Sequence, residues 1–206
     1  MSIEDIHVKY VYNTIAKEFD NTRYRPWSCV ENFLDDIPSG SIIGDIGCGN
    51  GKNMLYRNDC INLGCDFSEN LIKICQEKNI NAIVGDILNI PFQENTFDYT
   101  ICIAVIHHLS TNEKRKKAIQ ELQRVTKPNG KILILVWALE QENDSRRKFV
   151  KQENFVDWKD KKQNLLGKRY YYVFQKNELE SLTNKNLIEK SFYEKGNWGI
   201  IINNHK

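Results

Sequence analysis

The sequence of 206 residues predicts an α/β fold with a doubly wound, mostly parallel sheet. Three observations lead to this prediction. Short apolar runs typical of buried strands alternate along the chain with amphipathic stretches typical of helices. The apolar run at 132–136 is unbroken, as expected for a parallel strand covered on both faces. A glycine-rich loop follows the first predicted strand, and folds of this class bind ligands at such strand ends.

The elements of the amino-terminal half are expected in a regular order. Apolar residues at helical spacing predict an amphipathic helix over about 5–20, which should cover part of the ligand cleft. A short helix at 31–34 and a Pro-Ser-Gly turn precede the first strand, at 41–46. The second strand, at 61–66, leads to Ser68, which we expect to cap the next helix.

The carboxyl-terminal half continues the alternation. Strands are predicted at 81–84, 99–106 and 131–138, and the helix before the last of these begins at Thr111 or Asn112 as its cap. Periodicity is lost over 140–169, which predicts a basic insertion or lid. Order resumes at 170–174, followed by a short helix at 178–182. The runs 187–193 and 198–202 predict a final hairpin.

Length and composition favour a single domain over residues 1–206, with 41% hydrophobic residues to form its core. The net charge is +2, from 29 basic and 27 acidic residues, so any nucleic-acid contact must come from a local patch. The six cysteines are isolated, without a C-x-x-C pair or a histidine at metal-ligand spacing, which predicts reduced thiols, no metal site and a cytoplasmic location. No membrane span or secretion signal is expected.

The loop GDIGCGNGK at 44–52 is the most informative motif. A dinucleotide-binding loop would have glycine at position 52, and a phosphate-binding P-loop would have glycine at 46 and Ser or Thr at 53. The pattern that remains is D-x-G-x-G-x-G, headed by Asp45. A negative charge there disfavours a pyrophosphate and suits a ligand with an ammonium and a sulfonium group.

This loop resembles motif I of the class I S-adenosylmethionine (SAM) methyltransferases, a Rossmann-like family whose seven-stranded sheet ends in an antiparallel strand. Asp66 lies nineteen positions after Gly47, where an acidic residue binds a ribose hydroxyl, although a plain surface aspartate remains the alternative. The resemblance implies that Asp86 faces the adenine amino group. The predicted SAM-binding residues are Asp45, Gly47, Gly49, Asn50, Gly51, Asp66, Phe67, Asp86, Ile87 and Ala104.

Over most of its length the chain resembles the eukaryotic tRNA carboxymethyluridine methyltransferases, also found as the methyltransferase half of an AlkB-type tRNA hydroxylase. The resemblance rests on five segments: TRYRPW at 22–27, the glycine loop, AVIHHLST at 104–111, VWALEQ at 136–141 and GNW at 196–198. It implies methyl esterification of the carboxylate of 5-carboxymethyluridine at the tRNA wobble position. It also implies a small zinc-binding activator protein that pairs with a sheet edge, for which the third strand is a plausible site.

A carboxylate acceptor determines which residues are expected in the site. Its pKa is about 4, so it is ionised at neutral pH and needs positioning rather than a general base. Arginine binds planar anions well, which makes Arg23 and Arg25 candidates, one for the carboxylate and one for phosphate. His107 and His108 either orient the acceptor or hold the loop.

The remaining predicted substrate residues are aromatic or polar. Trp27 and Trp137 are candidates for stacking on an anticodon-loop base, although core packing is the simpler role for Trp137. The resemblance adds Glu140 and Asn197. The basic stretches 114–117, 146–148 and 159–162 either face solvent or contact tRNA phosphate.

Two other functions stay open. A small-molecule methyltransferase, for example one acting on a quinone or fatty acid, would also suit His107 and His108, but it would favour an apolar lid. A non-catalytic paralogue that binds SAM or RNA is the second. The chain departs from the family at 155–158, where FVDW replaces a Val-Pro-Trp type segment, and the insertion is rich in lysine.

Overall fold

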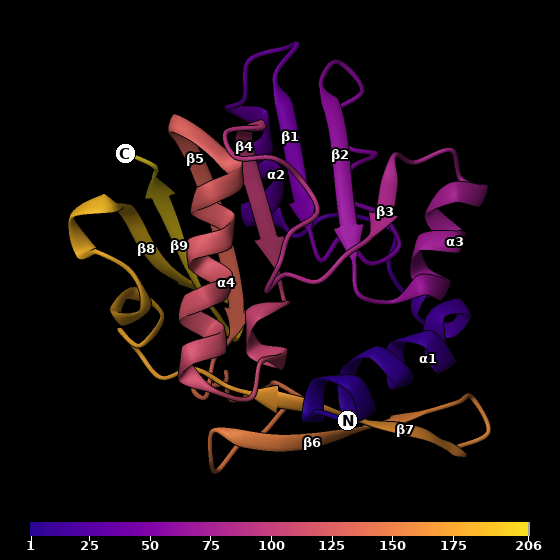
Figure 1. Cartoon of the computed structure of the whole chain (residues 1–206). Helices are drawn as coiled ribbons and strands as arrows, with labels where there is room; N and C mark the ends of the chain where they lie inside the picture. Colours follow the sequence, from indigo (N-terminus) through magenta and orange to yellow (C-terminus); the bar gives the residue numbers. More distant parts are fainter. Residues whose placement is uncertain (206) are drawn as a thin grey trace.

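The computed structural model describes residues 1–205 and contains a seven-stranded sheet of order β3-β2-β1-β4-β5-β9-β8 (Figure 1). Strand β9 runs antiparallel to both of its neighbours, and the other ladders are parallel. The predicted fold class is therefore confirmed. The strands are β1 (Ile42–Ile46), β2 (Ile61–Asp66), β3 (Ala82–Val84), β4 (Phe97–Ile103), β5 (Thr126–Trp137), β8 (Ile188–Glu194) and β9 (Asn197–Asn203).

Helices flank both faces of this sheet. A π-helical turn, η1, runs directly into α1, so that 5–20 is helical as predicted. Ser68 accepts a hydrogen bond from Leu71 N and caps α3, and Thr111 does the same for Lys114 N at the start of α4. The helical segments are η1 (Asp5–Lys9), α1 (Tyr10–Asp20), α2 (Ser28–Asp35), α3 (Glu69–Glu77), η2 (Ile106–His108), α4 (Asn112–Val125), η3 (Leu179–Leu182) and η4 (Lys185–Leu187).

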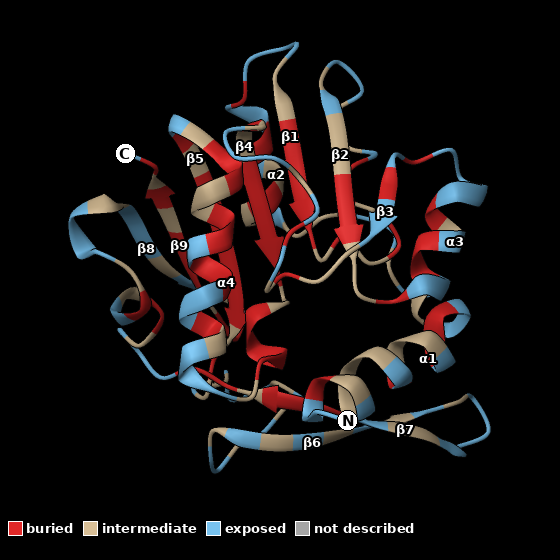
Figure 2. Ribbon diagram, viewed as in Figure 1, coloured by how far each residue is buried: buried red, intermediate tan, exposed pale blue. Residues whose placement is uncertain are grey.

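Strand β5 shows why the sheet is covered on both sides. Its side chains alternate between the two faces, because successive residues of a strand point in opposite directions. Ile132 and Ile134 belong to the apolar cluster that contains the buried side of α4. Leu133 and Leu135 belong to the cluster formed with α2. Figure 2 shows the resulting concentration of buried residues in the central strands.

The fourth strand is shorter than the predicted 99–106. It ends at Ile103, and Ala104 adopts a left-handed conformation with φ of 63°. That backbone cannot continue a strand, and the chain turns into η2 instead. The sequence stays apolar beyond the end of β4, because Ile106 in η2 is also fully buried. The apolar pattern therefore did not show where the strand ends.

The segment 140–169 contains strands that the sequence did not predict. Strands β6 (Glu153–Lys159) and β7 (Leu165–Tyr172) form a two-stranded antiparallel sheet. The half-buried side of β6 carries Asn154, Val156 and Trp158, so polar and apolar residues share one face and the usual alternation is absent. In Figure 1 this hairpin and α1 lie across the carboxyl ends of β1, β2 and β4.

Candidate active site

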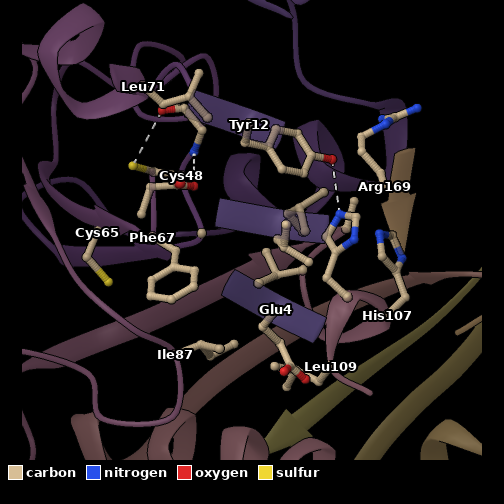
Figure 3. Close-up of a pocket in the computed structure, with 18 of the residues that line it drawn as sticks. Glu4, Tyr12, Cys48, Cys65, Phe67, Leu71, Ile87, His107, Leu109 and Arg169 are labelled. Atoms are coloured by element: carbon tan, nitrogen blue, oxygen red, sulfur yellow. Dashed lines mark hydrogen bonds between the residues drawn. The ribbon is translucent and has the colours of Figure 1, made fainter. Parts of the chain in front are cut away.

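A cavity of about 400 Å³ lies between the carboxyl ends of the strands and the covering elements α1 and β7. Figure 3 shows side chains from both sides pointing toward it. The predicted site residues that line it are Arg23, Trp27, Gly47, Gly49, Asn50, Asp66, Phe67, Asp86, Ile87, Ala104, His107, His108 and Trp137. The structure thus brings most of the predicted residues together at one place.

The glycine loop forms one end of this cavity and is held by β2. Gly47 N and Cys48 N donate to Cys65 O at 2.8 and 3.0 Å. Gly47 has φ of 80°, and a Cβ atom there would lie 2.2 Å from Val105 Cγ2. Only glycine tolerates both the positive φ and the close approach of Val105. Without a side chain at this position, the loop backbone stays open toward the cavity.

Asp66 ties this loop to the start of α3. Its Oδ2 accepts from Gly49 N at 2.9 Å, and its Oδ1 accepts from Ser68 N at 2.8 Å. Burial raises the pKa of Asp66, while these backbone hydrogen bonds oppose the shift. A carboxylate oxygen can accept more than one hydrogen bond, so Asp66 can still bind a ligand hydroxyl. Asp86 is similar, with Oδ1 accepting from Leu88 N at 2.8 Å.

Asp45 lies beneath the loop rather than in the cavity wall, with 1% of its surface exposed. Its Oδ2 accepts a weak hydrogen bond from Asn53 Nδ2 at 3.3 Å, and among the described residues its Oδ1 has no partner. Burial is the main cause that raises the pKa of Asp45 to about 7. Gly51 also lies outside the cavity, and its Cα faces Ile80 and Cys75.

The unfolding free energy of the Asp45→Asn variant should differ from that of the wild type in a pH-dependent way. Folding raises the pKa of Asp45 from 3.8 to about 7, so between these values the unfolded state binds fewer protons and wild-type stability falls as pH rises. The full effect is at most about 4 kcal/mol. Urea unfolding of both proteins from about pH 4 to pH 8 tests this. A wild-type-minus-variant difference that is constant over this range would contradict it.

Arg23 lines the cavity, whereas Arg25 does not. Asn50 Nδ2 donates to Asp20 Oδ1 at 2.7 Å and to Arg23 O at 2.9 Å, which fastens the residues after α1 to the glycine loop. The Arg23 guanidinium lies 5.2 Å from the Phe19 ring. The side chain of Arg25 is 78% exposed and pairs with Glu31 at 2.9 Å. The two arginines are therefore not equivalent.

The two histidines are buried and already hydrogen-bonded. His108 Nδ1 lies 2.7 Å from Tyr170 O, which can only accept, so Nδ1 carries the proton and Nε2 accepts from Tyr12 OH at 3.0 Å. His107 Nδ1 accepts from Trp137 N at 3.0 Å. Burial lowers the pKa of His107, and it lowers the pKa of His108 to about 3. Both rings are neutral at physiological pH, and they connect η2 to α1, β5 and β7.

Trp137 forms an aromatic wall with β7. Its ring stacks on Tyr171 with centroids 4.1 Å apart and an interplanar angle of 9°, and the Arg147 guanidinium lies 4.5 Å from it. Trp27 lines the cavity and also a neighbouring hollow of about 330 Å³, shared with Arg147 and Asn197. Lys52 Nζ is 5.4 Å from the Trp27 ring, and burial lowers the pKa of Lys52.

Besides Arg25, two predicted substrate residues lie away from the cavity, Glu140 and Asn197. Glu140 Oε2 accepts from Trp198 Nε1 at 2.9 Å, and its Oε1 accepts from Lys176 N at 3.2 Å. Asn197 donates to Glu194 O and Lys195 O, both at 3.0 Å, and faces the neighbouring hollow. These contacts hold β9 to its surroundings.

The cavity residues that were not identified from the sequence include Tyr12, Arg169 and Tyr171. Tyr12 lies on the helix predicted to cover the cleft, which was a partial signal. Arg169 and Tyr171 reach the cavity only because β7 folds back over the strand ends.

Within residues 1–205, no cluster of three or more His, Cys, Asp or Glu side chains is arranged to hold a metal ion. None of the helices over the same range combines the length and apolarity that crossing a bilayer requires.

Residues 44–134 match the family model described as "Methyltransferase domain". The chain is 38% identical to the tRNA (carboxymethyluridine(34)-5-O)-methyltransferase of Schizosaccharomyces pombe, with 96% of each chain covered. It is 34% identical to the alkbh8 protein of the same description from Xenopus tropicalis, over 98% of this chain. It spans only 41% of that frog protein. A solved complex of the Haloferax volcanii Trm112 methyltransferase activator with a putative methyltransferase is similar in fold, with TM-score 0.66, 12% identity, and 96% of both chains covered.

Proposed function

Because this chain belongs to the tRNA (carboxymethyluridine) methyltransferase family, we propose that it transfers the methyl group of SAM to the carboxylate of 5-carboxymethyluridine at the tRNA wobble position. The observation that supports this most directly is the composition of the cavity. The glycine loop, Asp66 and Asp86 line one part of it, and Arg169, Tyr171 and Trp137, which lie together, line another. The first part suits a nucleoside cofactor and the second an anionic base.

The residues at the loop end fit SAM. The carboxylates of Asp66 and Asp86 are held by backbone N–H groups and line the cavity, which supports their proposed binding of ribose hydroxyls and an adenine amino group. Phe67 and Ile87 supply apolar walls for the adenine ring. Gly47 keeps the loop backbone accessible to the methionine part. When bound, SAM supplies an electrophilic methyl group on a sulfonium.

No group in the site needs to remove a proton in this reaction. A carboxylate oxygen of the acceptor forms the new bond to the methyl carbon as the carbon–sulfur bond breaks, and the electron pair goes to sulfur. His107 and His108 are neutral and hold the cavity wall, which suits a reaction without general-base catalysis. The protein contributes by excluding water and aligning the acceptor.

The acceptor belongs to an anticodon loop in this proposal, and the aromatic residues support it. Trp27 and Trp137 line the cavity and offer ring faces for unstacked bases. The covering hairpin is basic rather than apolar, with exposed Lys159, Lys161 and Lys162 near its turn. Such a surface attracts RNA phosphate, whereas an apolar lid would suit the quinone or fatty-acid alternative.

Two further parts of the proposal concern partner and location. The edge strand β3 exposes Ile83 and Val84 by 44% and 45%, and an exposed strand edge is suited to pairing with another chain. We propose that the zinc-binding activator implied by the family resemblance pairs there. The six cysteines are free thiols, which supports a cytoplasmic location.

Transfer of labelled methyl from SAM to tRNA tests the function. The chain, with and without the activator, is expected to label tRNA that carries 5-carboxymethyluridine and to leave unmodified tRNA unlabelled. The label should be released as methanol by mild alkali, because a methyl ester hydrolyses and an N- or C-methyl group does not. Labelling of unmodified tRNA, or an alkali-stable product, would overturn the proposal.

A further inference from the structure

Arg169 is a buried cation in the cavity wall. It lies on β7 with 6% of its surface exposed, and it lines the cavity. One terminal nitrogen, Nη1, donates to Tyr171 OH at 2.7 Å. Its Nε has no hydrogen-bond partner among the described residues. No ion pair of those residues includes it either.

This arrangement is energetically costly for the free protein. A buried charge is ordinarily paired, and leaving one unpaired costs several kcal/mol. Three aromatic rings offset part of that cost, because the guanidinium lies 4.7 Å from the Trp158 ring, 5.2 Å from Tyr171 and 6.0 Å from Tyr12. A buried donor that stays unpaired while lining a cavity is available to a ligand that enters it.

Among residues 1–205, no carboxylate forms an ion pair with Arg169. The histidines and Tyr171 nearby are neutral, since burial lowers the pKa of both histidines and raises the pKa of Tyr171. The other charged side chains that act on His107 and Tyr171, Arg147 and Arg23, are cations. Glu4, a carboxylate in the cavity wall, is occupied by Lys114 at 2.7 Å. Of the cavity aspartates, Asp5 accepts from Ser2 N at 2.8 Å, and Asp66 and Asp86 accept backbone N–H groups beside the glycine loop and at Leu88. An anion entering beside the histidines would therefore find Arg169 as an unpaired partner.

We propose that Arg169 binds the carboxylate of the acceptor nucleoside, an inference that rests on the function proposed above. Nε–H donates to one carboxylate oxygen, and the other oxygen stays free to attack. Arg23 also lines the cavity, but its Nη1 already donates to Thr22 O at 3.0 Å and to Thr22 Oγ1 at 3.1 Å. Arg169 is thereby the residue that selects a charged wobble side chain over a neutral one.

The test compares two anticodon stem-loop RNAs, each bound in the presence of S-adenosylhomocysteine. One carries 5-carboxymethyluridine, and the other carries the uncharged 5-carbamoylmethyluridine. The wild type should prefer the charged RNA by about tenfold or more, and Arg169→Met should abolish that preference. Arg169→Lys should keep part of it. Lys168→Met is the matched control, because Lys168 precedes Arg169 on β7, is exposed, and carries the same charge.

Two further measurements separate this role from the alternatives. Calorimetry with SAM should give the same affinity for the wild type and Arg169→Met. The melting temperature of ligand-free Arg169→Met should be equal to or higher than that of the wild type, because an unpaired buried charge has been removed. The assignment would be overturned if Arg169→Met kept the RNA preference or lost affinity for SAM. It would also be overturned if this variant melted at a lower temperature and lost all binding. A wild type without methyl transfer or preference would instead refute the proposed function.

Discussion

Asp66→Asn is expected to weaken SAM binding by about 100-fold. Asp66 accepts hydrogen bonds from Gly49 N and Ser68 N, and it is the carboxylate proposed to meet the ribose. An asparagine places an NH₂ group against one of these N–H donors and loses the charge. Hydrogen bonds to charged groups contribute about 1.5–3 kcal/mol each, and about 1.4 kcal/mol corresponds to tenfold in affinity. Isothermal titration with SAM measures the effect.

Asp98→Asn provides the control for this prediction. Asp98 on β4 also accepts from a backbone N–H, that of Ile42 at 2.8 Å, and pairs with Lys127 away from the cavity. Its replacement should lower the unfolding free energy without changing SAM affinity. An affinity of Asp66→Asn within threefold of the wild type would show that the ribose contact is made by another residue.

Gly47→Ala is expected to abolish measurable SAM binding. The new Cβ would lie 2.2 Å from Val105 Cγ2, and φ of 80° is strained for alanine. The loop must therefore move, and the overpacking costs about 1–3 kcal/mol of stability in addition to the strain. SAM titration and urea unfolding of the same samples separate the loss of binding from the loss of fold.

Gly40→Ala isolates the contribution of the backbone. Gly40 has φ of 82°, but a Cβ atom there would meet nothing within 4 Å. This variant should lose about 1 kcal/mol of stability and retain SAM binding. Trimming the neighbour, in the double variant Gly47→Ala/Val105→Ala, should restore part of the affinity. If Gly47→Ala bound SAM as tightly as Gly40→Ala, the proposed crowding between residue 47 and Val105 would be contradicted.

The parts of the fold that could be predicted from the sequence are those with a local chemical cause. The cap at Ser68 follows from its hydroxyl, and β5 follows from an apolar run that both faces of the sheet bury. The hairpin β6–β7 lacked such a cause, because its inner side mixes Asn154 with Trp158. Its place over the cavity depends on contacts between distant segments, such as the approach of Gly167 to Val11.

The candidate site also contains residues that a local sequence pattern predicts and residues that only distant contacts bring to the cavity. The residues that give the glycine loop its conformation are close together in the sequence. Its role as a ligand-binding loop could therefore be predicted from the sequence. Arg23 and Arg25 are two positions apart, and contacts with distant residues distinguish them: Asn50 holds Arg23 O, and Glu31 pairs with the Arg25 side chain. Arg169 reaches the same cavity from β7, far along the chain, and no local pattern distinguishes it from other basic residues of that segment.

The position of α1 and β7 over the strand ends has a kinetic consequence. The cavity lies between these elements and the sheet. For the proposed reaction, we therefore expect the base and the spent cofactor to leave past Tyr12 and Tyr171. Tyr12 OH and Tyr171 OH lie 3.4 Å apart, which joins the two elements above the site. Separating them is slow compared with the making of one bond in a preorganised site, so we expect product departure to limit turnover.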